Sequence, residues 1–138
     1  MIWIVTGPPC SGKSTYINEN ATEKDLIIDM DRLALAICRE GTQPFEYDDL
    51  VRKVARSARQ AAVREAISRM QGERYRNLFI IHTDPNSDQR MSYRAANARF
   101  VELDPGKEIC LQRLKDRPAA NQAIAKQVIE DFYAKRGK

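Results

Sequence analysis

The sequence has no long apolar run, and this shortage excludes a membrane protein of the helical kind. The longest apolar stretches among its 138 residues are only a few residues long, too short to cross a bilayer as a helix. No basic segment precedes the first apolar run, and Gly7 interrupts that run at once, so we expect no signal peptide.

Cysteine and histidine are also scarce. The three cysteines (Cys10, Cys38 and Cys110) are far apart with no CxxC pair, and there is one histidine, so no zinc site is expected. An odd cysteine count without a signal peptide favours a reducing, cytoplasmic setting. The net charge of +4 permits a polyanionic substrate without proving one.

What remains is typical of one globular domain. Hydrophobic residues make up 43% and charged residues 30% of the sequence, and no repeat or low-complexity tract interrupts it. A chain of this length can bury one core and not two. We therefore expect a single domain over residues 1–138.

The first motif is GPPCSGKST, Gly7 to Thr15, directly after the apolar run Ile2–Thr6. It matches the P-loop pattern G-x-x-x-x-G-K-[ST], in which backbone N–H groups surround phosphate and a following helix points its positive end at it. Lys13 would reach the β- and γ-phosphates of ATP, and the Ser14 hydroxyl would bind Mg²⁺. The predicted nucleotide-binding residues are Gly7, Pro9, Cys10, Ser11, Gly12, Lys13, Ser14 and Thr15.

Strand-like and helix-like segments alternate along the chain. This alternation predicts an α/β fold with about four parallel strands and helices on both faces. Together with the P-loop, it resembles a minimal P-loop NTPase, and this resemblance implies the strand order 2-3-1-4. The expected strands are 2–6, 26–29, 78–82 and 99–103. The expected helices are 14–20, 31–40, 48–71, 88–97, 107–116 and 121–136.

Acidic residues follow the second and third expected strands, where parallel sheets bind ligands. Asp29 and Asp31 are two apart and would project to the same face if the strand continues through them. One could hold Mg²⁺ and the other accept the proton of an attacking hydroxyl, although either could simply cap the next helix. Asp84 could act as an acid at its strand end or as a turn residue before Pro85. His82 is expected to be a packed strand-end residue.

Two arginine pairs are candidates for binding a transferring phosphoryl group. Arg113 and Arg117 are four apart, so on one helix they would share a face, and Pro118 would end that helix. Guanidinium groups stabilise the charge that spreads over phosphoryl oxygens in transfer. Arg90 and Arg94 are also four residues apart and are the less favoured candidates for this role. Most of the basic residues of segment 48–71 are expected to form a solvated face.

The P-loop, the strand ending near Asp31 and the Arg113-x-x-x-Arg117 pattern together resemble the kinase domain of bacteriophage polynucleotide 5′-kinase and the small P-loop kinases grouped with it, including zeta-type toxins. The resemblance implies ATP and Mg²⁺ as cofactors and Lys13, Asp31, Arg113 and Arg117 as catalytic residues, with Asp31 as general base. The residues predicted to bind the acceptor substrate are Asp29, Arg32, Asp84 and Arg90. The predicted Mg²⁺ ligands are Ser14 and Asp29.

One departure concerns the acceptor. The resembled enzymes place an acceptor-binding arginine three residues after the base, where this chain has Ala34, with Arg32 beside Asp31 instead. Three functions stay open. The first is a kinase acting on a nucleic-acid or nucleotide hydroxyl, such as a 5′-end or a hydroxymethyl pyrimidine of DNA. The others are a small-molecule kinase and a nucleotide-binding or ATPase module without an acceptor.

Overall fold

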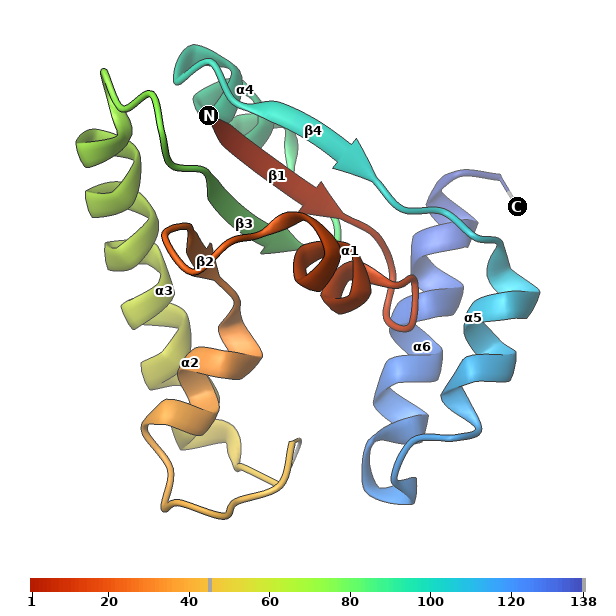
Figure 1. Ribbon diagram of the computed structural model, residues 1–138. Helices are drawn as coiled ribbons and strands as arrows, with labels where there is room; N and C mark the ends of the chain where they lie inside the picture. The colour runs from red at the N-terminus through yellow and green to blue at the C-terminus, as the bar shows by residue number, and fades with distance from the viewer. Residues whose placement is uncertain (45, 138) are drawn as a thin grey trace.

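The computed structural model describes residues 1–44 and 46–137, except for the side chains of residues 119–121. Its described strands form one parallel sheet in the order β2-β3-β1-β4, as the sequence predicted (Figure 1). The strands are β1 (Ile2–Thr6), β2 (Leu26–Ile28), β3 (Leu78–His82) and β4 (Arg99–Glu102). In register, Ile4 of β1 lies between Ile80 of β3 and Phe100 of β4.

The helices fall close to the expected segments. They are α1 (Lys13–Asn20), α2 (Met30–Ala36), α3 (Asp49–Met70), α4 (Ser87–Ala95), α5 (Lys107–Leu114) and α6 (Ala119–Lys135). The largest difference is α2, which was expected to run to Glu40. It ends at Ala36 because the N–H of Cys38 turns back to Leu35 O at 3.2 Å, in the tighter i→i−3 pattern that commonly closes a helix.

Helices cover both faces of the sheet because alternate strand residues are apolar on both sides. Ile4 and Ile80 face a cluster with Met70 of α3 and Tyr93 of α4. Val5 and Phe79, their neighbours along the strands, face Ile17 of α1 on the opposite side. Burying each such side chain contributes about 1.5–3 kcal/mol, so the two clusters together hold β1 and β3 in the centre of the domain.

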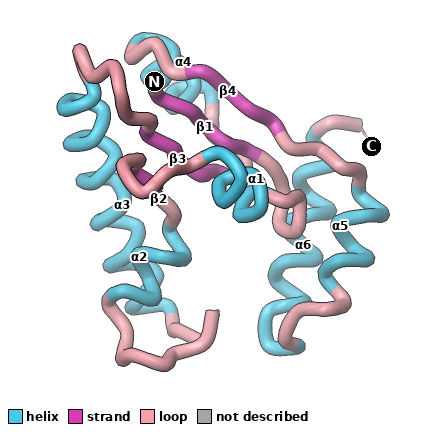
Figure 2. Tube along the Cα trace, viewed as in Figure 1, coloured by secondary structure: helices cyan, strands magenta, loops and turns pink. Residues whose placement is uncertain are grey.

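The last two helices form a hairpin beyond the carboxyl ends of β1 and β4 (Figures 1 and 2). Their own core includes Cys110, Leu114, Ile129 and Phe132, all buried. A hydrogen bond of 2.7 Å from the Tyr133 hydroxyl to Asp104 ties α6 to the segment after β4. The hairpin therefore stands at the edge of the sheet where the P-loop lies.

In the part of the chain that the structure describes, no helix combines the length and the apolar character that crossing a membrane requires.

Candidate active site

The first half of the P-loop requires glycine. Gly7 has φ +154° and donates its N–H to Thr83 O at 3.2 Å, which joins the loop to the end of β3. A Cβ at this position would lie 2.5 Å from Ser11 Oγ and 2.6 Å from Leu103 O. Since one of these neighbours is backbone, a side chain would force the loop to move.

The second half of the loop turns its backbone into α1. Cys10 and Gly12 have positive φ angles, +65° and +98°. Successive residues in such conformations direct backbone N–H groups toward a common point and form an anion nest. The first helical residue is Lys13, and no side chain caps the helix, so its first N–H groups remain open to a ligand.

The side chain of the P-loop lysine contacts the first residues of the loop. Lys13 Nζ donates to the carbonyl oxygens of Gly7 and, at 3.3 Å, Pro8. Burial lowers the pKa of Lys13 to about 8, and the neighbouring Asp29 opposes that shift. The amine is still mostly protonated at pH 7, so it can pair with phosphate oxygens.

Asp29 and Asp31 do not continue the strand, which corrects the geometry expected from the sequence. β2 ends at Ile28, and the Asp29 carboxylate caps α2 by accepting the Asp31 N–H at 3.2 Å. Asp31 lies in the first turn of α2 and is exposed. Burial, reinforced by the charge of Asp31, raises the pKa of Asp29.

The structure brings both carboxylates and an arginine near Lys13. Asp29, Arg117 and Asp31 all act electrostatically on its amine. Arg113 Nη1 donates to Cys10 O at 3.0 Å, so it contacts the P-loop itself. Arg117 is not on the same helix face, because α5 ends at Leu114 and Arg117 follows in the turn. Pro118 caps the next helix and does not end α5.

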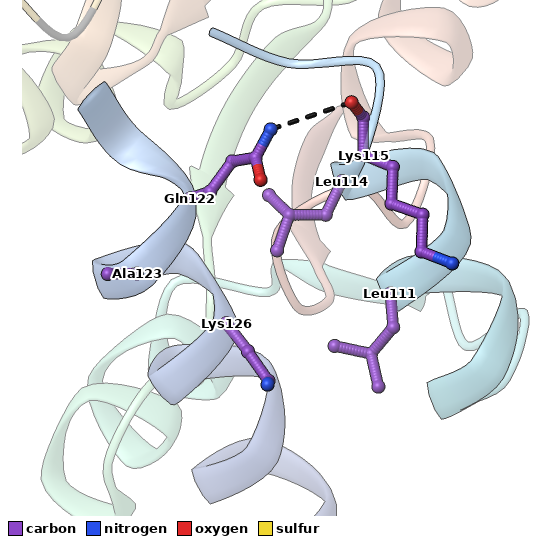
Figure 3. Close-up of a pocket in the computed structure, with 6 residues that line it drawn as sticks. All are labelled: Leu111, Leu114, Lys115, Gln122, Ala123 and Lys126. Carbon is purple, nitrogen blue, oxygen red and sulfur yellow. Dashed lines mark hydrogen bonds between the residues drawn. The ribbon is translucent and has the colours of Figure 1, made fainter. Parts of the chain in front are cut away.

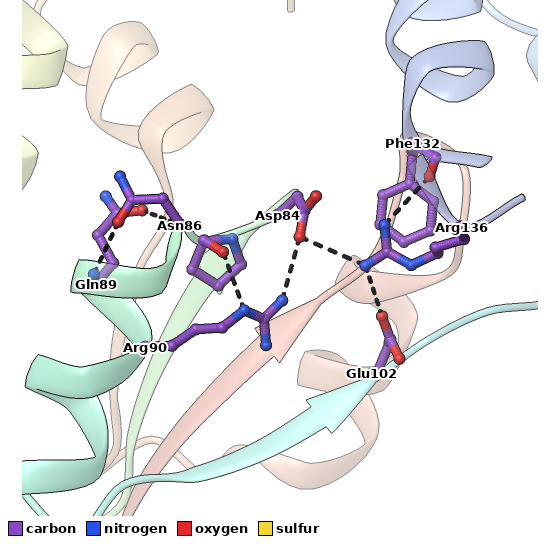
Figure 4. A network of polar contacts seen from close by, with 8 residues as sticks. Asp84, Asn86, Gln89, Arg90, Glu102, Phe132 and Arg136 are labelled. Atoms are coloured by element: carbon purple, nitrogen blue, oxygen red, sulfur yellow. Dashed lines mark hydrogen bonds and ion pairs between the residues drawn. The ribbon is translucent and has the colours of Figure 1, made fainter. Parts of the chain in front are cut away.

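Asp84 is held by arginines at the end of β3. It forms ion pairs with Arg90 Nη2 at 3.1 Å and with Arg136 Nη2 at 3.4 Å (Figure 4). Arg136 also pairs with Glu102 at 2.9 Å. These partners lower the pKa of Asp84 against the opposing effect of burial. The pairing with Arg136, which is 52 residues away, leaves no local pattern that could have predicted it.

His82 lies beside this network as a packed residue, as expected. Its Nε2 is 2.6 Å from the Tyr93 hydroxyl, and burial, together with the charge of Arg59, lowers its pKa to about 3. Arg59 itself donates to Ile81 O at 2.9 Å. Arg59 is therefore an exception to the solvated face expected for most basic residues of this helix, because it is half-buried and reaches the end of β3.

Sequence reasoning also missed Tyr47. Its hydroxyl donates to Asp31 Oδ1, while the Arg52 guanidinium lies 5.5 Å from the centre of its ring. Tyr47 precedes α3 in a polar segment, and only the packing of α2 against α3 brings it to Asp31. Arg32, in contrast, is exposed, and its charge acts on Asp29.

A separate pocket of about 530 Å³ lies between α5 and α6 (Figure 3). Leu111 and Leu114 line it together with the aliphatic parts of Lys115 and Lys126, and Gln122 donates to Lys115 O at 3.5 Å. None of the residues predicted from the sequence as catalytic or ligand-binding lines this pocket.

The residues at the P-loop fit a nucleotide with Mg²⁺. Ser11 Oγ is buried and has no hydrogen-bond partner among the described residues, so the loop contains a polar atom that its own chain does not satisfy. No described group of three or more His, Cys, Asp or Glu residues could hold a metal by itself. Mg²⁺ at a nucleotide commonly takes one or two protein oxygens together with substrate phosphates and water. Ser14 and Asp29 would be those protein ligands.

A parallel sheet in the order β2-β3-β1-β4, with a phosphate-binding loop between β1 and α1, defines a P-loop NTPase fold. The family model described as AAA domain matches residues 2–137, and the chain belongs to that family. No curated protein matches the chain. The family supports P-loop nucleotide binding with kinase-like activity and does not identify an acceptor.

Proposed function

We propose that this chain is an ATP-dependent kinase that transfers the γ-phosphate to a hydroxyl of a nucleic acid or nucleotide. Two observations support the proposal: Asp29, Arg117 and Asp31 act electrostatically on Lys13 of the P-loop, and Arg113 donates to the loop carbonyl of Cys10 at 3.0 Å. A nucleotide-binding module without an acceptor would need the loop and a metal ligand. It would have less use for a second, exposed carboxylate beside the P-loop lysine.

In the proposed reaction the acceptor oxygen attacks the γ-phosphorus in line with the bond to the β–γ bridging oxygen. As the new P–O bond forms, that bond breaks, ADP leaves, and Asp31 takes the hydroxyl proton. Lys13, Arg113 and Arg117 stabilise the charge on the phosphoryl oxygens. Bound Mg²⁺ would neutralise part of the phosphate charge.

The test is a transfer assay with γ-labelled ATP. Single-stranded DNA and RNA with 5′-hydroxyl ends, hydroxymethylated duplex DNA and free nucleosides are assayed in parallel. We expect label to move to at least one of them. Lys13→Ala should lower the rate of transfer about a thousandfold or more, because the charge of the transition state loses the cation of the P-loop. Lys24→Ala, at an exposed position away from the loop, is the matched control. Hydrolysis of ATP with no labelled acceptor would contradict the proposal.

Salt dependence separates a polymer acceptor from a small one. A nucleic acid contacted through several phosphates loses affinity steeply as salt rises, because counterions are released on binding. A nucleoside or sugar does not. A flat dependence of the acceptor KM on salt concentration would favour the small-molecule kinase.

A further inference from the structure

Tyr47 is placed between two helices and touches the proposed general base. Its side chain is 7% exposed, and its ring packs with Ala34 of α2 and Ala55 of α3, both fully buried. At its outer end the hydroxyl donates to Asp31 Oδ1. Among the described residues, no other side chain hydrogen-bonds the Asp31 carboxylate.

Small side chains make room for this arrangement. Ala34 and Ala55 present only methyl groups toward the ring, and Val51 closes the same cluster. Any long side chain at position 34 would have to displace the ring or α3, since Ala34 has no exposed surface. The Arg52 guanidinium, 5.5 Å from the ring centre, adds a cation–π contact. The ring is therefore fixed from several sides, and its hydroxyl with it.

Without Tyr47, no comparable packing would fix the orientation of the Asp31 side chain. It is exposed, lies in the first turn of α2, and can rotate about two side-chain torsions. A carboxylate has two oxygens with about four lone-pair directions, so the hydrogen bond to Oδ1 leaves Oδ2 able to accept a proton. A catalytic base reacts efficiently only when it is held within reach of the proton that it removes.

We infer that Tyr47 is a positioning residue for the transfer reaction: its hydroxyl holds Asp31 Oδ1, so that Oδ2 is directed at the acceptor hydroxyl. This inference rests on the proposed function. The acceptor proton moves to Oδ2, and Tyr47 keeps its own proton throughout. Burial, with the hydrogen bond to Asp31 next in size, raises the pKa of Tyr47, which keeps the phenol neutral at working pH.

The test compares Tyr47→Phe, Asp31→Asn and the double variant with the wild type, using γ-labelled ATP and the best acceptor of the panel above. Phenylalanine keeps the ring, its packing and the Arg52 contact and removes only the hydroxyl. We expect Tyr47→Phe to lower kcat about tenfold, with the KM for ATP unchanged, as is usual for residues that orient a reacting group. Tyr75→Phe, at a position 88% exposed, is the matched control and should leave kcat unchanged.

The double variant separates positioning from a general structural role. If Tyr47 acts only through Asp31, its removal causes no further loss once Asp31 is Asn. A further loss of kcat in the double variant, or wild-type kcat in Tyr47→Phe, would overturn the inference while leaving the proposed function standing. Absence of transfer by the wild type overturns both.

A second measurement tests the hydrogen bond without any acceptor. With tyrosine labelled at the ring carbon that bears the hydroxyl, the signal of Tyr47 can be followed by NMR as pH rises. Because the Asp31 charge raises the pKa of Tyr47, Asp31→Asn should let Tyr47 ionise at a lower pH. An unchanged titration would show that the two side chains do not interact in solution and would overturn the inference.

Discussion

The carboxylates after β2 and the carboxylate after β3 lie at the same edge of the sheet, yet their surroundings are opposite. Asp84 has two arginine partners, which lower its pKa. Asp29 has burial and a neighbouring carboxylate, which raise its pKa, and Asp31 has a phenol as its one described side-chain partner. The pKa and the role of an acidic residue at the carboxyl end of a strand thus depend on its partners and not on its place at that end.

Acids already neutralised by arginines are poorly suited to accept a proton, because the ion pairs stabilise their charged form. Asp84 therefore acts in the first place as a link that joins the end of β3 to α4 through Arg90 and to the C-terminal end of α6 through Arg136. The carboxylates on the β2 side instead act electrostatically on Lys13. This division is open to direct test.

The largest expected difference is in catalysis. Asp31→Asn should lower kcat for transfer about a hundredfold or more, because amide cannot take the acceptor proton. Binding of ATP should stay close to that of the wild type. Asp84→Asn should lower kcat by about threefold or less, since the Asp84 carboxylate is already engaged by Arg90 and Arg136. Steady-state assays measure kcat for the two variants under the same conditions. Equal losses of kcat would contradict the different roles assigned to Asp31 and Asp84.

A smaller effect is expected on stability. Asp84→Asn should lower the free energy of unfolding at pH 7 by about 1–2 kcal/mol, because Arg90 and Arg136 lose a partly buried partner. The folded-state pKa of Asp84 is below its unfolded value, so its contribution is fully present above about pH 4 and is lost as pH falls through the folded pKa. Urea unfolding of variant and wild type from pH 7 to pH 3 measures this. A difference that grows toward acid would contradict the assigned pairing.

Sequence reasoning reached most of the fold because its signals are local. The parallel sheet follows from the alternation of strands and helices, its strand order follows from the resemblance to P-loop NTPases, and the residues at the strand ends follow from where the apolar runs stop. The P-loop needs only its eight-residue pattern. Two elements are shorter than their residue spacing predicted: β2 ends before Asp29, and α5 ends before Arg117.

What the sequence could not predict depends on distant packing. Tyr47 reaches Asp31 because α2 and α3 pack through alanines, and nothing near position 47 signals a role in the site. Arg136 forms an ion pair with Asp84 at the end of β3, and Arg59 of α3 donates a hydrogen bond to Ile81 O. Each contact is set by the tertiary fold, which brings together residues with no shared sequence pattern.

The smallest expected effect has the opposite sign and concerns Asp29. Its folded-state pKa is raised, so at neutral pH its ionised form is less stable in the folded chain than in the unfolded one, and this cost disappears as pH falls below the unfolded pKa. Asparagine caps helices about as well as aspartate, so Asp29→Asn should preserve the cap on Asp31 N–H while removing the charge. We therefore expect Asp29→Asn to raise the free energy of unfolding at pH 7 by less than about 1 kcal/mol, with the gain vanishing in acid. Asp29→Ala, which removes cap and charge together, is the control and should be less stable than Asp29→Asn. If Asp29→Asn is instead destabilised at pH 7 as Asp84→Asn is, the ionised carboxylate of Asp29 stabilises the fold too, and the two strand ends are alike.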